Sequence, residues 1–175
     1  MAFEKLLSPV RIGHVTIKNR VVMAPMGVGF APGDNQINDA YVRYFEARAR
    51  GGQGLITTPV ATVDDTTCGI AEPGAFNLTR PEDAEGIRRI TEACHKYGAK
   101  VSVQLCHPGR QSMTFWNHDQ QPVAPSPVPE NEYLQMPREL TREEIRSIVK
   151  KFALSASYAA AGGADGIEIH APTDI

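Results

Sequence analysis

The 175 residues suffice for one domain with a substantial core, and the 42% hydrophobic and 22% charged residues are typical of an ordinary globular protein. The net charge of −2 gives no electrostatic basis for a nucleic-acid partner. No apolar stretch approaches the ~20 residues of a membrane span, and the first residues lack the pattern of a signal peptide. The three cysteines are widely spaced and form no CxxC motif. We therefore expect a cytoplasmic protein with no metal site, no membrane partner and no nucleic-acid partner.

The first third of the chain predicts a hairpin, a strand and a helix. Alternating residues over 10–17 predict a short hairpin. Arg20–Ala24 is apolar enough for a first buried strand, and a glycine-rich loop follows over residues 27–35. Asn38 can cap a helix over residues 39–50, because its side chain can accept hydrogen bonds from the free backbone N–H groups of the first turn.

The middle of the chain repeats the order of strand and helix. Gly54–Thr58 predicts a second strand. Thr79 and Glu82 have the spacing of a capping box, which predicts a helix that runs to about Tyr97. Lys100–Cys106 predicts a third strand. Each strand is thus followed by a helix, which is the pattern of a parallel sheet with right-handed crossovers.

The last third opens with a long proline-rich loop over residues 107–138, and ordered loops of this length are usually functional. Thr141 and Glu144 form a second capping box, for a helix that runs to about Ala161. Gly166–His170 predicts the fourth strand. The helix carries an apolar stripe at helical spacing, made of Ile145, Ile148, Val149, Phe152 and Ala156.

Two architectures fit four strand–helix steps: an open doubly wound sheet and a (β/α)₈ barrel. The third and fourth strands alternate polar with apolar residues, and the polar face carries Ser102, Gln104, Cys106, Glu168 and His170. A doubly wound sheet is apolar on both faces, whereas a barrel wall can be polar toward its lumen. The pattern favours the barrel. A complete barrel takes about 250 residues, so this chain supplies about half of one.

Five segments in order carry a more specific signal: Ile17–Met26, Gly54–Thr58, Gln104–Arg110, the proline-rich stretch from Pro122 to Thr141, and Asp165–His170. Together they resemble the old yellow enzyme family of NADH:flavin oxidoreductases, and the proline-rich stretch resembles its 2,4-dienoyl-CoA reductase branch. The resemblance covers nearly the whole chain, but only the amino-terminal half of a family member. We therefore expect residues 1–175 to be one partial FMN-binding TIM-barrel domain that ends after the fourth strand.

The resemblance implies a function and a set of site residues. It implies an FMN-dependent enzyme that takes hydride from NADH or NADPH and reduces the activated C=C bond of a small-molecule alkene. It implies that the backbone of Ala24, Pro25, Met26 and Gly27, the backbone of Val60 and the amide of Gln104 contact the flavin. It also implies that His170 binds a substrate carbonyl oxygen, with Thr173 at the position of a second polar residue. Ile175 stands where many relatives carry a proton-donating tyrosine.

Simpler interpretations of the same residues stay open. Ala24–Gly27 also fits a tight turn, Gln104 also fits an amide bound by neighbouring backbone, and a lone histidine such as His170 is more often structural than catalytic. Glu168 needs a partner, which we expect to be a basic residue on a further strand. An iron–sulfur cluster, as in the dienoyl-CoA reductase branch, would need cysteines beyond this sequence. The alternative function is an inactive half-barrel that forms a homo-oligomer or complements a missing half, because open sheet edges invite pairing.

Overall fold

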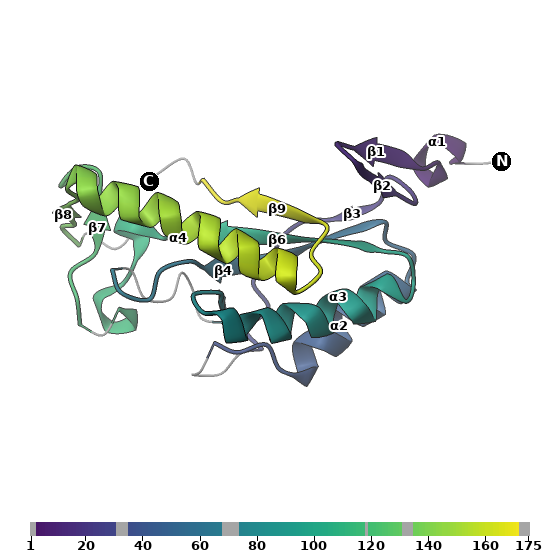
Figure 1. Cartoon of the computed structure of the whole chain (residues 1–175), viewed down its shortest axis with the longest axis horizontal. Helices are drawn as coiled ribbons and strands as arrows, with labels where there is room; N and C mark the ends of the chain where they lie inside the picture. The colour runs from purple at the N-terminus through teal and green to yellow at the C-terminus, as the bar shows by residue number, and fades with distance from the viewer. Residues whose placement is uncertain (1–2, 31–34, 68–73, 118, 131–134, 172–175) are drawn as a thin grey trace.

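The computed structural model describes residues 3–30, 35–67, 74–117, 119–130 and 135–171. Its main sheet has the order β3 (Val22–Met23), β4 (Leu55–Thr62), β6 (Lys100–Cys106) and β9 (Gly166–Ile169), with β5 (Phe76–Asn77) added at the far end of β4. Every pairing in this sheet is parallel (Figure 1). The predicted parallel sheet is therefore confirmed, and β3 and β9 are its outer strands.

Three helices connect the strands, and their ends follow from local capping. Helix α2 (Asp39–Arg50) begins where predicted, because the Asn38 side chain accepts hydrogen bonds from Ala40 and Tyr41 N–H. Helix α4 (Arg142–Ala161) begins at the predicted capping box, in which Thr141 and Glu144 bond each other's backbone N–H. Both helix predictions are confirmed.

Helix α3 (Ala84–His95) begins differently from its prediction. A 3₁₀ turn, η1 (Pro81–Asp83), precedes it, and Asp83 Oδ2 accepts from Thr79 N–H at 2.9 Å and from Arg80 N–H at 3.0 Å. The capping box predicted from Thr79 and Glu82 is therefore wrong. The Asp83 carboxylate takes the role that the prediction gave to Glu82, because it accepts hydrogen bonds from the backbone N–H groups that precede the turn. Pro81 contributes no N–H of its own at the start of this turn.

Two strands also differ from their predicted lengths. The predicted first strand, Arg20–Ala24, pairs only over Val22–Met23, and it is not buried, because Val22 is 52% exposed on the outer strand. The second strand continues past Thr58 to Thr62 through Pro59. A register shift in its pairing with β6 between Thr57 and Val60 accommodates the proline, which cannot donate to the ladder.

The hydrophobic core lies between one face of the sheet and the helices. Val101, Val103 and Leu105 of β6 point into it and are almost fully buried. The helices supply most of the remaining core residues, which include Tyr41, Phe45, Ile87, Ile90, Cys94 and Ala159. The predicted assignment of the apolar face of β6 to the helix side is confirmed, and the polar face of the same strand is left on the opposite side.

The two ends of the strands carry different structures (Figure 1). The short helix α1 (Glu4–Leu7) and the predicted hairpin, β1 (Val10–Ile12) and β2 (Val15–Ile17), lie at the end where the strands begin. The long loop lies where the strands end, and it contains η2 (Gly109–Gln111), η3 (Thr114–Trp116), β7 (Val123–Ala124) and β8 (Arg138–Glu139).

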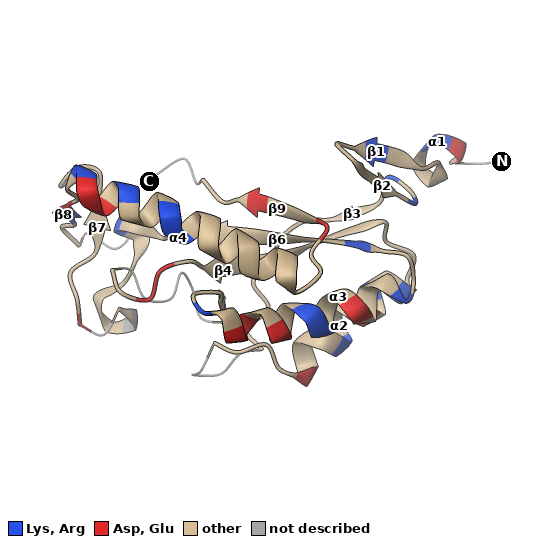
Figure 2. Ribbon diagram, viewed as in Figure 1, with Lys and Arg blue, Asp and Glu red and all other residues tan. Residues whose placement is uncertain are grey.

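Charged residues of both signs are interspersed along α2 and α3 (Figure 2). Arg88 pairs with Glu85 and Glu92 on α3, and Arg89 joins α3 to Asp39 of α2. Exposed pairs of this kind stabilise a fold little, so packing holds the helices. In the described part of the chain, no helix has the length and hydropathy needed to cross a bilayer.

Candidate active site at the carboxyl ends of the strands

A row of side chains crosses the sheet on the face opposite the helices. Val60 of β4 is in register with Gln104 of β6, and Gln104 is in register with Glu168 of β9. Val60 and Gln104 are 8% and 5% exposed, and Val60 packs with Ala75 and Cys106 in a small second cluster. The row therefore places an amide and a carboxylate side by side near the carboxyl ends of three parallel strands.

Gln104 is held at both its backbone and its side chain. Its N–H donates to Thr58 Oγ1 at 3.4 Å, in the stretch where Pro59 interrupts the regular ladder. Its Nε2 donates to Glu168 Oε1 at 2.6 Å. The prediction that Glu168 needs a basic partner on a further strand misses this contact, because the sequence alone does not show that residues 104 and 168 are neighbours.

The segment Ala24–Gly27 follows β3 at the same edge of the sheet. Ala24, Met26 and Gly27 are exposed and Pro25 is half-buried. The loop continues to Gly29, which has a φ of +64° and lies against Gly74; a Cβ on Gly74 would be 2.5 Å from Gly29 Cα. The loops after β3 and β4 thus meet backbone to backbone at Gly29 and Gly74.

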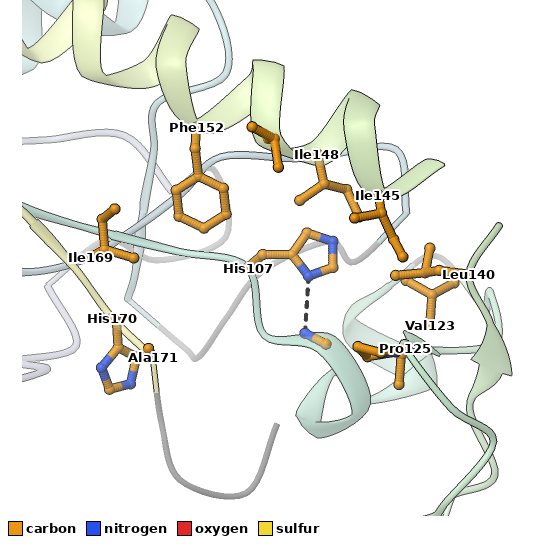
Figure 3. Close-up of a pocket in the computed structure, with 13 residues that line it drawn as sticks. His107, Val123, Pro125, Leu140, Ile145, Ile148, Phe152, Ile169, His170 and Ala171 are labelled. Carbon is orange, nitrogen blue, oxygen red and sulfur yellow. Dashed lines mark hydrogen bonds between the residues drawn. The ribbon is translucent and has the colours of Figure 1, made fainter. Parts of the chain in front are cut away.

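His170 follows β9, and its N–H donates to the Leu105 carbonyl at 2.9 Å. Figure 3 shows Ile169 pointing toward Phe152 of α4, while the His170 ring points to the other side of the strand. Strand residues two apart share a face, so His170 lies on the same face as Glu168 and Gln104. Thr173, the other predicted catalytic residue, lies outside the described residues.

A buried polar cluster at this end of the sheet was not predicted. The Asp64 side chain, just past β4, is 0% exposed and accepts from Thr66 N–H at 2.8 Å, Thr66 Oγ1 at 2.7 Å, Thr67 Oγ1 at 2.6 Å and Lys151 Nζ of α4. Burial opposes its ionisation, but hydrogen bonds from Lys151, Thr67 and Thr66 outweigh burial and hold the pKa of Asp64 well below its usual range. The only signal in the sequence is the polar run that follows the strand.

His107, just past β6, joins this cluster. Its Nδ1 accepts from Gly109 N–H at 3.1 Å, so the neutral ring carries its proton on Nε2, which lies 3.2 Å from Thr67 Oγ1. Burial lowers the pKa of His107, although the nearby Asp64 opposes this. The ring is therefore neutral at neutral pH. These contacts hold the loops after β4 and β6 together at His107.

An apolar hollow of about 360 Å³ opens beside this cluster, between α4, β9 and the long loop (Figure 3). Its walls include His107, Val123, Leu140, Ile145, Val149 and Phe152. The predicted apolar stripe of α4 is thus divided. Ala156 packs against the core, and Phe152 contacts both the core and the hollow. Ile145 and Val149 are 39% and 63% exposed and line the hollow. Among the described residues, no group of three or more His, Cys, Asp or Glu side chains is arranged to hold a metal ion.

These features define a class of protein. Parallel strands, helices on one face and polar side chains on the other face at the carboxyl ends are the arrangement of a β/α barrel with its site at the mouth. A family model supports a narrower assignment, because it matches residues 5–173. The chain belongs to the NADH:flavin oxidoreductase / NADH oxidase family, a family of oxidoreductases.

Individual relatives agree with this assignment. The chain is 41% identical over 170 residues to an NADH oxidase of Thermoanaerobacter brockii, covering 96% of this chain and 26% of that protein. It is 34% identical over 169 residues to an NADPH dehydrogenase of Listeria monocytogenes, covering 96% of this chain and 48% of that protein. The chain therefore spans between about a quarter and half of the length of these relatives.

Two solved structures share the fold. The old yellow enzyme homologue from Zymomonas mobilis has a TM-score of 0.84 and 28% identity, covering 95% of this chain and 48% of that chain. Morphinone reductase has a TM-score of 0.84 and 29% identity, covering 94% and 48%. Both are TIM barrels of the old yellow enzyme type. The prediction of a TIM-barrel half is therefore confirmed.

Proposed function

We propose that this chain forms the amino-terminal half of an FMN-dependent enzyme that reduces activated C=C bonds with NADH or NADPH. The observation that carries the proposal is the Gln104 amide, held by Glu168 on the polar face of the sheet. His170 lies on the same face of the sheet as Gln104, and the Ala24–Gly27 segment lies at the same edge, where the strands end. The names of the relatives support NADH or NADPH as the reductant, and the morphinone reductase structure is a complex with tetrahydroNAD.

The residues present fit FMN in their chemistry. A flavin ring is flat and presents alternating hydrogen-bond acceptors and a donor along its pyrimidine edge, which an amide such as Gln104 can match. Small residues allow a flat ring to approach the backbone closely, and Ala24 and Gly27 are such residues at the two ends of the Ala24–Gly27 segment. Val60 lies in register beside Gln104, so its backbone is the third predicted contact.

When bound, FMN would supply the transfer of hydride between the nicotinamide and the β-carbon of the alkene. The role of His170 is to donate a hydrogen bond to the carbonyl or similar oxygen that activates the alkene. Negative charge builds on that oxygen as hydride adds, and a fixed donor stabilises it. Thr173 is the proposed second donor to the same oxygen. The substrate is a small alkene that carries such an electron-withdrawing group.

Because the chain spans only part of its relatives, we assign the activity to a longer polypeptide or to a complex with a complementing half. We propose no iron–sulfur cluster within residues 1–175; such a cluster would need cysteines outside this sequence. The alternative is an inactive half-barrel that forms a homo-oligomer. The two outer strands favour this alternative, because an open strand edge can pair with another chain. Each outer strand also carries an exposed apolar side chain: Val22 on β3 is 52% exposed and Ile169 on β9 is 65% exposed.

The first experiment is to add FMN to the purified chain and record its visible spectrum and flavin fluorescence. The proposal expects shifted flavin bands and quenched fluorescence. Size-exclusion chromatography with light scattering separates the alternatives: a monomer that binds FMN contradicts the inactive oligomer, and an oligomer that leaves FMN free contradicts the proposed flavin site.

Substitution of Gln104 tests the flavin contact. Gln104→Ala removes one polar contact with the pyrimidine edge, so we expect the dissociation constant of FMN to rise about tenfold, the value of one hydrogen bond. Fluorescence titration measures it. Ser157→Ala, an exposed change on α4, is the control. Equal affinity in both variants would remove Gln104 from the site.

Substitution of His170 tests catalysis in the assembled enzyme. His170→Ala leaves the reduction of flavin by nicotinamide unchanged, while turnover of the alkene falls by about 100-fold, the lower end of the loss on removing one donor to a developing negative charge. Stopped-flow absorbance follows the two half-reactions separately. An equal loss in both half-reactions would show that His170 does not act on the alkene.

A further inference from the structure

We propose that Glu168 is a positioning residue that fixes the orientation of the Gln104 amide, so that the carbonyl Oε1 of Gln104 faces the ligand and accepts a hydrogen bond from its N–H. This inference rests on the proposed flavin site, in which the N–H is the imide group of the pyrimidine ring. It assigns a role to Glu168, whose carboxylate contacts Gln104.

The chemistry of the pair determines which end of the amide is used. A carboxylate oxygen can only accept, whereas an amide donates through nitrogen and accepts through oxygen. The atom of Gln104 that faces Glu168 must therefore be Nε2, and it lies 2.6 Å from Oε1 of the carboxylate. The opposite orientation would place Gln104 Oε1 against the Glu168 carboxylate oxygen at a partly buried site. Two acceptors without a hydrogen between them repel each other, so this orientation is strongly unfavourable.

The surroundings keep this orientation in place. The Gln104 backbone is fixed by Thr58 Oγ1, and its side chain is 5% exposed. Glu168 stands directly opposite on the next strand, in regular register. The Gln104 amide is planar, and its nitrogen and oxygen point in different directions. The hydrogen bond from Gln104 Nε2 to Glu168 on β9 therefore turns Gln104 Oε1 away from Glu168. Within the described part of the chain, no donor reaches that oxygen, which leaves it available to a ligand.

The same geometry explains why a carboxylate is better suited here than a second amide. A hydrogen bond to a charged group is about twice as strong as a neutral one. A glutamine at position 168 could keep the hydrogen bond in two ways, with either amide as donor. Two orientations of Gln104 would then be populated, and only one of them would present an acceptor to the ligand.

The first test needs no ligand. Proton–nitrogen correlation spectra of the full chain resolve the Gln104 side-chain amide, which is assigned by its absence in Gln104→Leu. We expect one downfield-shifted proton with slow exchange, and its return to the position of a free amide in Glu168→Met, which keeps the volume but cannot accept the bond. A Gln104 amide at the free position in the unsubstituted chain would overturn the proposal, whatever the result with flavin.

The second test is the affinity for FMN, measured by calorimetric titration of the same full chain. Glu168→Gln should weaken binding about twofold, since about half of the molecules have the competent orientation. Glu168→Met should weaken it about tenfold, because the amide is then unrestrained until FMN binds. Glu143→Gln, on the exposed surface of α4, is the matched control for loss of a glutamate charge.

The pattern of affinities separates the interpretations. A role in packing predicts that both Glu168 variants bind like the control, and a role of charge alone predicts equal losses in both; either result overturns the proposal. If the unsubstituted chain does not bind FMN, the proposed flavin site fails, and the amide spectra still decide whether Glu168 orients Gln104.

Discussion

Lys151→Met is the most informative single change outside the candidate flavin site. Lys151 reaches from α4 to Asp64, whose side chain is 0% exposed and which lies just past β4. The substitution keeps most of the side-chain volume and removes the ammonium group. Thr66, through its N–H and its hydroxyl, and Thr67, through its hydroxyl, continue to donate to Asp64. The buried carboxylate thus loses the hydrogen bond and the charge of a cation in direct contact with it.

The size of the effect follows from burial. Removing one partner of a buried ion pair costs about 3–5 kcal/mol, because a charge is left in a poorly solvated site. Lys151 is 27% exposed and Asp64 keeps its hydrogen bonds from Thr66 and Thr67, so the lower end applies. We expect the free energy of unfolding to fall by about 3 kcal/mol at neutral pH.

The effect has a defined dependence on pH. The pKa of Asp64 is held below its usual range in the folded protein, so its contribution to stability is present above its unfolded pKa of about 3.9 and is lost as the pH falls toward the folded pKa. In Lys151→Met the folded pKa rises. The difference between the two proteins is therefore full at pH values above the folded pKa of the variant, and it shrinks as the pH falls from there toward the folded pKa of the unsubstituted protein.

Urea unfolding followed by circular dichroism measures this difference at neutral and acidic pH. Lys150→Met is the matched control, because Lys150 is the preceding residue of α4 and is exposed. If the free energy of unfolding falls no more in Lys151→Met than in Lys150→Met, the assignment of a buried ion pair is refuted. A loss that stays constant from neutral to acidic pH would refute its electrostatic origin.

Two further substitutions test the backbone at the site. Thr58→Val removes the acceptor of Gln104 N–H, so we expect a loss of about 1–2 kcal/mol in urea unfolding, against a smaller change for the exposed strand residue in Thr16→Val. Gly74→Ala needs a positive φ and places a Cβ 2.5 Å from the backbone of the loop after β3. Gly13→Ala also needs a positive φ, but its Cβ meets nothing within 4 Å, so its loss of stability measures the cost of the positive φ alone, about 1–2 kcal/mol. In thermal unfolding, Gly74→Ala should lose more stability than Gly13→Ala. Equal losses in the two glycine variants would show that the loops relax around the added carbon.

Local signals in the sequence predicted most of the fold. Asn38 and the pair Thr141 and Glu144 cap their helices as their spacing indicates, because capping depends on residues only a few positions apart. The alternation of Lys100–Cys106 predicted which face of β6 meets the helices. The continuation of β4 through Pro59 was missed, because a proline usually ends a central strand and only the bulge permits it.

The candidate site was only partly predictable. Gln104 and His170 were selected because strand alternation and the resemblance to a family pointed to the same residues. The contact of Gln104 with Glu168 joins residues 64 positions apart, and that of Asp64 with Lys151 joins residues 87 apart. Contacts this distant depend on sheet order and on where α4 crosses, and neither can be deduced from the spacing of residues.

The order β3, β4, β6, β9 has a geometric consequence for any closure of the sheet. Both outer strands run in the same direction, since every pairing between them is parallel. If two copies were related by a half-rotation about an axis along the strands, β3 of each would come beside β9 of the other and all the strands would run in one direction. A half-rotation about an axis across the strands would join like edges in opposite directions. Only the first operation produces a continuous parallel cylinder with both copies of Gln104 at the same rim.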